Sequence, residues 1–310
     1  MPSNDAQGSH AEDQDAPSSL SRVRSLFSIP TPLKRLFETV PVLTYSPNEL
    51  PQRAPHPSKL PNLYVFGKGA AAAAGRPSFN PSCLKWQTFL KIAGIDHQLV
   101  SSNNHASPTG VLPFLLPAAQ SSHAGDHAAL PIPSNRLVKY ARERGSEVAE
   151  PTGVRYEAYQ SLLDHRIRNA WLYTLYLEPY NFNAVAYPLY VTPSSSNPIV
   201  CSIIAHQLRQ AAEVELLKQS VKIDADDLYS EVDKAFESLS VLLGEDEWFF
   251  DDTPTLFDAS VFAYTHLLLD ERMGWKEKAM VRALRKRENL VQHRERLLNQ
   301  LSNIERLMAA

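Results

Sequence analysis

Apolar residues recur at three- and four-residue steps between residues 81 and 93, with polar residues on the opposite side, and this pattern predicts an amphipathic helix. Asn80 and Pro81 form a typical helix start, because an Asn side chain caps free N–H groups and Pro has none to leave unpaired. Gly94 is typical of the residue that ends a helix.

Short apolar runs on both sides of this helix predict strands. The predicted strands cover residues 63–66, 95–102 and 111–116, the last entered through Leu112 and Pro113. The small-residue run 67–76 predicts a loop, and Ser134 predicts the cap of a further helix that continues to residue 144. This order of elements is typical of a thioredoxin-like domain, which we place at residues 61–145.

The chain from residue 151 to 310 is predicted to be all-helical. The predicted helices cover residues 155–178, 199–220, 225–243, 256–270 and 276–308, after a linker at 146–153 and around an irregular insertion at 179–198. Thr255 and Asp258 have the spacing of a capping box, with Asp in place of the usual Glu or Gln. The helix that they open is apolar all round, so we expect it to be buried.

The chain before the first strand has two parts. Residues 1–19 are polar and acidic, which is typical of disorder. Residues 20–60 form a Pro-rich arm with more large apolar side chains than a solvated linker needs. Its candidate partner-binding residues are Leu26, Phe27, Ile29, Leu33, Lys34, Arg35, Leu36 and Phe37. Three roles stay open for the arm: packing on the chain's own body, docking on another protein, or lying on a membrane surface.

Composition and charge narrow the classes of function. The net charge of -3 does not indicate a nucleic-acid partner, and two cysteines among 310 residues favour a reducing compartment over a disulfide framework. We expect no membrane-spanning helix, because no stretch approaches the ~18 apolar residues that one requires. We expect neither metal nor cofactor. His123, Asp126 and His127 lie in a small-residue loop, and the glycines of 67–76 lack the ending of a phosphate loop.

The start of the first helix is the candidate chemical site. Thioredoxin-like redox proteins carry Cys-Pro-x-Cys there, and this chain has Asn-Pro-Ser-Cys at 80–83, with an amide where the nucleophilic thiolate would be. The remaining nucleophile candidates are Ser78, Ser82 and Cys83, and Cys83 is expected to face the core. Ser134, at a helix N-terminus, could hold a carboxylate. The pattern therefore predicts the fold without its redox chemistry.

A thioredoxin-like domain followed by an all-helical domain resembles the glutathione-transferase architecture. The motifs resemble those of metaxins more than those of active transferases. They are Pro-x-Cys-Leu at 81–84, Ser-Pro-x-Gly-x-Leu-Pro at 107–113 and Pro-Thr-x-x-Asp-Ala at 254–259. The arm segment 27–39 resembles the N-terminal segment of the fungal metaxin-like subunit of the mitochondrial sorting and assembly machinery that lacks a membrane span.

This resemblance implies a non-catalytic, peripheral protein on the cytosolic face of the mitochondrial outer membrane. Its implied partners are the β-barrel subunit of that machinery, the larger metaxin-like sister subunit, and barrel precursors with their C-terminal β-signal. A peptide edge at Leu112 and Pro113 is expected if the bond between them is cis. The alternatives are a glutathione-dependent transferase and a tether to a lipid surface.

Overall fold

The structure is a computed structural model that describes residues 59–118, 130–148 and 151–309. All of them belong to one compact unit, His56–Ala310. Residues 20–58 of the arm, with all of its candidate partner-binding residues, lie outside the described residues, as do His123, Asp126 and His127. The arm's role therefore stays a prediction.

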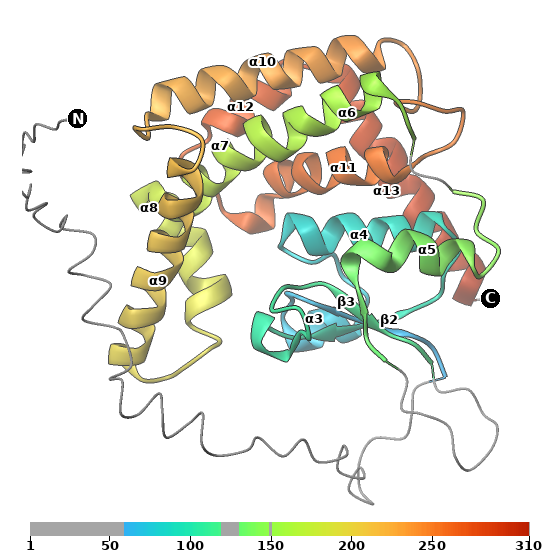
Figure 1. Cartoon of the computed structure of the whole chain (residues 1–310), viewed down its shortest axis with the longest axis horizontal. Coiled ribbons are helices and arrows are strands. Elements are labelled where there is room, and N and C mark those ends of the chain that lie inside the picture. The colour runs from blue at the N-terminus through green and yellow to red at the C-terminus, as the bar shows by residue number, and fades with distance from the viewer. Residues whose placement is uncertain (1–58, 119–129, 149–150, 310) are drawn as a thin grey trace, which may run out of the picture. The chain divides into compact units, whose positions relative to one another are not determined.

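The first part of this unit is a small mixed sheet with helices. Strands β1 (Asn62–Val65), β2 (Gln98–Ser101), β3 (Phe114–Leu116) and β4 (Ile132–Pro133) lie in the order β2-β1-β3-β4. β1 is parallel to β2 and antiparallel to β3, and β3 is antiparallel to β4. The helices α4 (Pro81–Ile92) and α5 (Leu137–Arg142) cover one face of the sheet (Figure 1). The predicted thioredoxin-like architecture is confirmed, although the second and third strands are shorter than predicted.

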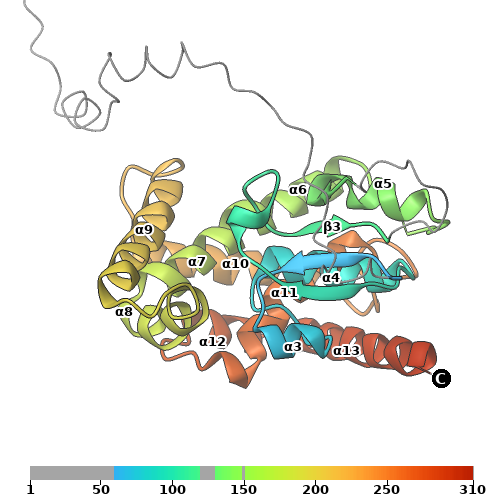
Figure 2. The same cartoon turned by 90° about the horizontal axis from the view of Figure 1, so that it is seen from below.

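Helix α4 begins as the sequence predicts. The side chain of Asn80 accepts a hydrogen bond from the N–H of Cys83, and Pro81 is the first helical residue. After the helix ends, Gly94 has a φ of 69°, a left-handed conformation that glycine adopts without strain. Viewed from below, the sheet lies in front of α4 (Figure 2).

Two predictions beside the sheet were wrong. The run 67–76 contains a short helix, α3 (Gly69–Ala73), because a series of alanines has high helix propensity. Ser134 caps no α-helix: it opens the 3-10 turn η2 (Ser134–Arg136), and α5 begins only after it. A second 3-10 turn, η1 (Asn104–Ala106), lies between β2 and β3.

The second part of the unit is helical, as predicted. Its first segment runs through α6 (Val154–Ser161), the π-helix η3 (Leu162–Ile167), α7 (Arg168–Leu172) and the π-helix η4 (Tyr173–Leu177). Later elements are α9 (Pro198–Leu217), α10 (Ala225–Leu243), α11 (Leu256–Leu269) and the 3-10 turn η6 (Glu271–Met273).

Residues 179–191 are helical, so the predicted irregular insertion is wrong over most of its length. Helix α8 (Pro179–Asn181) starts at a cap in which the carboxylate of Glu178 accepts from the N–H groups of Tyr180 and Asn181. The π-helix η5 (Phe182–Val191) follows and buries four apolar side chains, three of them in the helical core. The Glu178 cap and the burial of apolar side chains stabilise a helical course here, although the segment is rich in Pro and Ser.

The predicted final helix is broken into α12 (Ala279–Arg285) and α13 (Glu288–Ala309). Arg287 lies at the break and is only 8 % exposed. Its guanidinium donates to Asp233 and Glu237 of α10, at 2.6 Å for the shortest contact. The break thus turns a charged residue inward, where two carboxylates neutralise it.

The two parts share one interface, built mainly by α4 and α11. Leu84 of α4 belongs to the apolar core of the helical part, whereas Leu256 and Ala259 of α11 belong to the core beneath the sheet. The predicted capping box is confirmed: Asp258 accepts from the backbone N–H and the hydroxyl of Thr255, both at 2.9 Å. As predicted, α11 is buried nearly throughout.

Candidate functional site

The candidate site lies where α4 begins, and Asn80 occupies the position of a redox nucleophile. Its Nδ2 donates to the hydroxyl of Tyr190 at 3.3 Å, and its Oδ1 accepts from the N–H of Cys83 at 3.2 Å. Its backbone N–H donates to Ser78 Oγ. Both ends of the amide are therefore engaged in internal hydrogen bonds.

Cys83 is the one sulfur beside this helix start, and it is fully buried. Burial raises the pKa of its thiol to about 12, against smaller opposing effects of hydrogen bonds from Phe66 and Ser78. A thiol with so high a pKa holds almost no thiolate at neutral pH, and the thiolate is the nucleophile. The expectation that Cys83 faces the core is confirmed.

The serine candidates are not activated either. Ser78 is buried, and its hydroxyl donates to the backbone carbonyl of Phe66 at 2.5 Å. Ser82 is exposed to solvent, where a serine hydroxyl has its ordinary weak nucleophilicity. Ser134 opens a 3-10 turn of three residues, which offers a carboxylate no helix N-terminus.

Tyr190 also packs against three other aromatic rings, and we call the four residues the aromatic cluster: Phe66, Phe79, Tyr176 and Tyr190. The ring of Tyr190 lies 5.3 Å from that of Phe66, 5.1 Å from that of Phe79 and 5.9 Å from that of Tyr176. Burial raises the pKa of Tyr176 to about 12 and that of Tyr190 well above its ordinary value, so both phenols stay protonated at neutral pH. The cluster is therefore uncharged at neutral pH. Its phenols can form hydrogen bonds, but neither of them can act as a general base.

Sequence reasoning missed Tyr190, which reaches this position from η5, 110 residues along the chain from Asn80. The only sequence signal was the high Tyr content of a segment predicted to be irregular. A π-helical turn that brings one phenol to a distant helix start has no local pattern from which it could be predicted.

At the predicted peptide edge, the peptide bond is cis as the prediction requires, but the backbone groups are already engaged. The Leu112–Pro113 bond is cis, and both side chains are buried. β3, which follows them, is paired on both sides, and the Leu112 N–H donates to Asn104 Oδ1 at 3.0 Å. An added strand needs free backbone groups. Peptide binding here stays a prediction, and it requires Asn104 to release that N–H.

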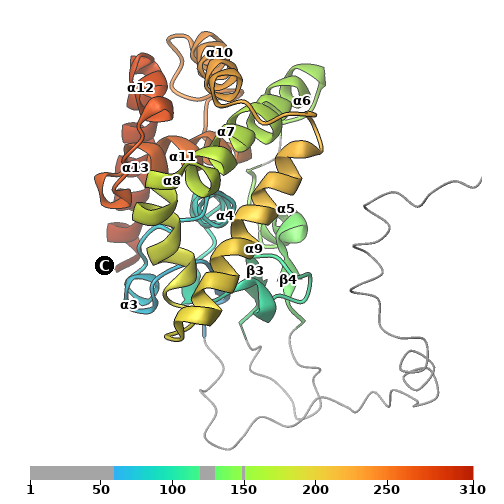
Figure 3. The ribbon, with the colours of Figure 1, turned by 90° about the vertical axis from the view of Figure 1, so that its left-hand side faces the viewer.

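A second surface is the outer side of α9, which faces the viewer in Figure 3. Helix α9 carries Ile199, Ile203, Val214 and Leu217, each 44–71 % exposed. The spacing of these residues places them along one stripe of the helix.

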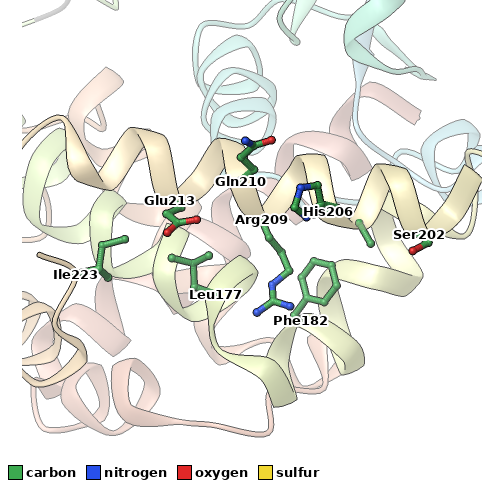
Figure 4. A pocket seen from close by; sticks show the side chains of 9 residues that line it. Leu177, Phe182, Ser202, His206, Arg209, Gln210, Glu213 and Ile223 are labelled. Carbon is green, nitrogen blue, oxygen red and sulfur yellow. The ribbon is translucent and has the colours of Figure 1, made fainter. Parts of the chain in front are cut away.

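Beside this stripe, α9, the end of η4, the start of η5 and Ile223 line a groove of ≈ 620 Å³ (Figure 4). Arg209 extends toward the ring of Phe182, with its guanidinium carbon 5.4 Å from the ring centroid. Glu213 lines the same groove, so its charges are mixed. Sequence reasoning missed this groove, because it depends on how η4, η5 and α9 pack.

The described residues contain neither a metal-binding cluster nor a membrane-spanning helix. Among residues 59–118, 130–148 and 151–309, no three His, Cys, Asp or Glu side chains lie together as a metal site. In the same residues, no helix combines the length and the hydropathy needed to cross a bilayer.

Comparison with known proteins agrees with this fold. The glutathione S-transferase N-terminal domain family matches residues 81–181, and the glutathione S-transferase C-terminal domain family matches residues 232–297. The chain has a glutathione-transferase-like fold. Two glutathione S-transferases of Ceriporiopsis subvermispora, both solved with glutathione, are 12 % and 15 % identical; each match covers 79 % of this chain and 98 % of theirs, with a TM-score of 0.48.

The curated relatives are metaxins. Metaxin-3 of Xenopus laevis is 25 % identical over 74 % of this chain and 70 % of its own, and Metaxin-1 of Mus musculus is 25 % identical over 73 % and 71 %. Metaxin-2 of Homo sapiens is 23 % identical over 63 % of this chain and 73 % of its own. The similarity spans most of the described residues and agrees with the resemblance found in the motifs.

Proposed function

We propose that this metaxin-like protein with a glutathione-transferase-like fold is a non-catalytic subunit of the β-barrel sorting and assembly complex of the mitochondrial outer membrane. It attaches peripherally on the cytosolic face. There it caps the barrel subunit, contacts the larger metaxin-like sister subunit and helps to engage the β-signal of barrel precursors.

One observation carries the non-catalytic part of this proposal. The nucleophile's position is held by Asn80, whose amide is bound to Tyr190 and to the backbone of Cys83. Covalent and thiolate-stabilising catalysis both need an activated donor at this point. The described residues supply a neutral amide, a neutral phenol and a buried thiol.

The similarity to metaxins supports the assignment to the outer membrane, and the arm supplies the means of attachment. Its apolar residues, such as Phe27 and Phe37, are the large anchors that dominate protein interfaces. Lys34 and Arg35 lie between them and favour the approach to an acidic surface.

The test is co-purification from fungal mitochondria in mild detergent, with identification of the β-barrel subunit and of the sister subunit. The full chain should bring down both, and a variant without residues 20–45 should lose the barrel subunit. Absence of the barrel subunit from the full-chain sample would contradict the proposed function. Its retention after the deletion would contradict the role of the arm alone.

Paired substitutions separate apolar docking from attachment to lipid. Phe27→Ser with Phe37→Ser should release the barrel subunit, whereas Lys34→Gln with Arg35→Gln should mainly slow association. If the arm attached to lipid through charge alone, the Lys34 and Arg35 substitutions would have the larger effect. Salt well above about 0.15 M would then abolish the attachment.

The transferase alternative is tested on the same sample. Retention on glutathione resin and turnover of a generic electrophile should both be absent. Turnover at a rate typical of enzymes would overturn the non-catalytic assignment, whatever the chain's partners are.

A further inference from the structure

A pocket with unusual chemistry lies where the sheet-containing part meets the helical part, well along α4 from Asn80. Its volume is ≈ 270 Å³. It is lined by the segment before α4, by α4 itself, by α11, by η6 and by α13. The proposed function uses none of these lining residues.

The first distinctive feature of the pocket is its charge. Arg76, Lys91 and Arg272 line it, and no carboxylate is among the described residues of its lining. Each of three other grooves in the described part of the chain has at least one Asp or Glu in its lining. Asp270 pairs with Arg272 at 2.9 Å from outside the lining. The described lining is therefore rich in cationic side chains.

The second feature is a pair of buried polar side chains without partners. His266 is 3 % exposed, and neither of its ring nitrogens has a hydrogen-bond partner. Thr88 is 1 % exposed, and its hydroxyl also lacks one. Both residues line the pocket. Most buried polar side-chain atoms in proteins have a partner, so two such residues at one pocket indicate a polar occupant.

The protonation of His266 restricts what that occupant is. Burial lowers the pKa of His266 to about 4, and the nearby Arg294 and Arg272 add to this effect against Asp270. At neutral pH the ring is therefore uncharged, with one N–H to donate. Its ring packs on Phe262, with a centroid separation of 5.1 Å, and this contact fixes its orientation.

We propose that this pocket binds a phosphate group. Guanidinium groups match phosphate oxygens in geometry and charge, and the imidazole N–H and the threonine hydroxyl can donate to the same oxygens. The volume exceeds that of one water, whose share of the liquid is about 30 Å³, and lies just below the usual range for drug-sized ligands. A phosphate and the first atoms of the group that carries it fit this space.

The phosphate can belong to a lipid headgroup or to a soluble ligand, since the recognising chemistry is the same. The first probe is inorganic phosphate, titrated into the full chain by calorimetry and followed in parallel by the NMR signals of the histidine rings. The second probe is a phosphatidylcholine vesicle with or without phosphatidic acid, used in co-sedimentation at physiological salt.

Arg76→Glu is the main variant, because Arg76 is exposed at the rim and its replacement leaves the core intact. Arg136→Glu is the matched control: it changes the net charge equally on an exposed residue outside the pocket. Thr88→Val removes a donor without changing charge or shape, and its unfolding midpoint is measured to verify the fold.

We expect phosphate to bind the full chain and to shift the ring signals of His266, which a His266→Gln sample identifies. Arg76→Glu should weaken phosphate binding by about tenfold or more, Thr88→Val less, and Arg136→Glu by less than about twofold. If the three variants weaken vesicle binding in the same order, the bound phosphate belongs to a lipid headgroup. Phosphate binding without vesicle binding identifies a soluble ligand.

Two results would overturn the phosphate site. One is the absence of phosphate binding to the full chain at millimolar concentration. The other is an equal loss in Arg76→Glu and Arg136→Glu, which would reduce the effect to overall charge. Neither result depends on the barrel or sister subunits, so the proposed function would stand.

Discussion

Asp258 is predicted to be the most sensitive single position for the stability of the helical part. It is fully buried, and its carboxylate accepts from Thr255, from the N–H of Phe249 at 3.1 Å and from His293 Nε2 at 2.9 Å. These bonds join the start of α11 to α13 and to the turn before α11. Asp258→Ala removes all of them while leaving the donors buried.

The expected loss follows from those donors. Three of them, the N–H groups of Thr255 and Phe249 and Nε2 of His293, would stay buried without an acceptor, at about 1–3 kcal/mol each. Removal of a buried carboxylate offsets part of this sum. We expect Asp258→Ala to lower the free energy of unfolding by about 4 kcal/mol, against about 1 kcal/mol for loss of a helix cap alone.

Urea unfolding followed by tryptophan fluorescence measures this difference, with Thr255→Val and Asp252→Ala beside it. Thr255→Val removes the capping hydroxyl only, and Asp252→Ala removes an exposed carboxylate of the same turn. Thr255→Val should lose about 1 kcal/mol and Asp252→Ala less than about 0.5 kcal/mol. If Asp258→Ala unfolds within about 1 kcal/mol of Asp252→Ala, the network does not hold these elements together.

Acidification from pH 6.5 to pH 4 should destabilise the fold by up to about 3 kcal/mol, because the unfolded state protonates His266 while burial holds its folded pKa at about 4. Burial also lowers the pKa of His97, which destabilises the fold at low pH in the same way. Urea titrations across this pH range should show a smaller loss of unfolding free energy for His266→Gln than for the unmodified chain. Iodoacetamide should leave Cys83 unmodified in the native chain, as mass spectrometry of its peptide would show, because burial raises the pKa of the thiol to about 12. Asn80→Cys should react slowly with the same reagent while Tyr190 covers it, and Asn80→Cys with Tyr190→Ala should react faster by about tenfold or more.

Elements with strong local signals could be predicted from the sequence. Asn80 and Pro81 mark the start of α4, Thr255 and Asp258 mark the start of α11, and α10 has the predicted bounds. Each depends on side chains within a few residues of the helix end, so short-range spacing suffices.

Elements decided by distant contacts could not be predicted. The break before α13 exists because Arg287 reaches carboxylates of α10, more than forty residues earlier. The helical course of 179–191 depends on burial against the rest of the helical core, which overrides the composition of the segment. The same limit applies to the site: the sequence shows that a thiolate is missing, but only the structure shows what fills its place.

The side chains around Asn80 bear on the proposal that the chain is not catalytic. A missing nucleophile alone leaves a site that a single substitution could restore. Here Asn80 donates to Tyr190, Tyr190 packs against the other rings of the aromatic cluster, and the N–H of Leu112 donates to Asn104. A single substitution at Asn80 would leave the contacts among the other side chains in place. The chain's own side chains thus pack at the start of α4, and the proposed binding surfaces and pocket are tested by measuring affinity rather than turnover.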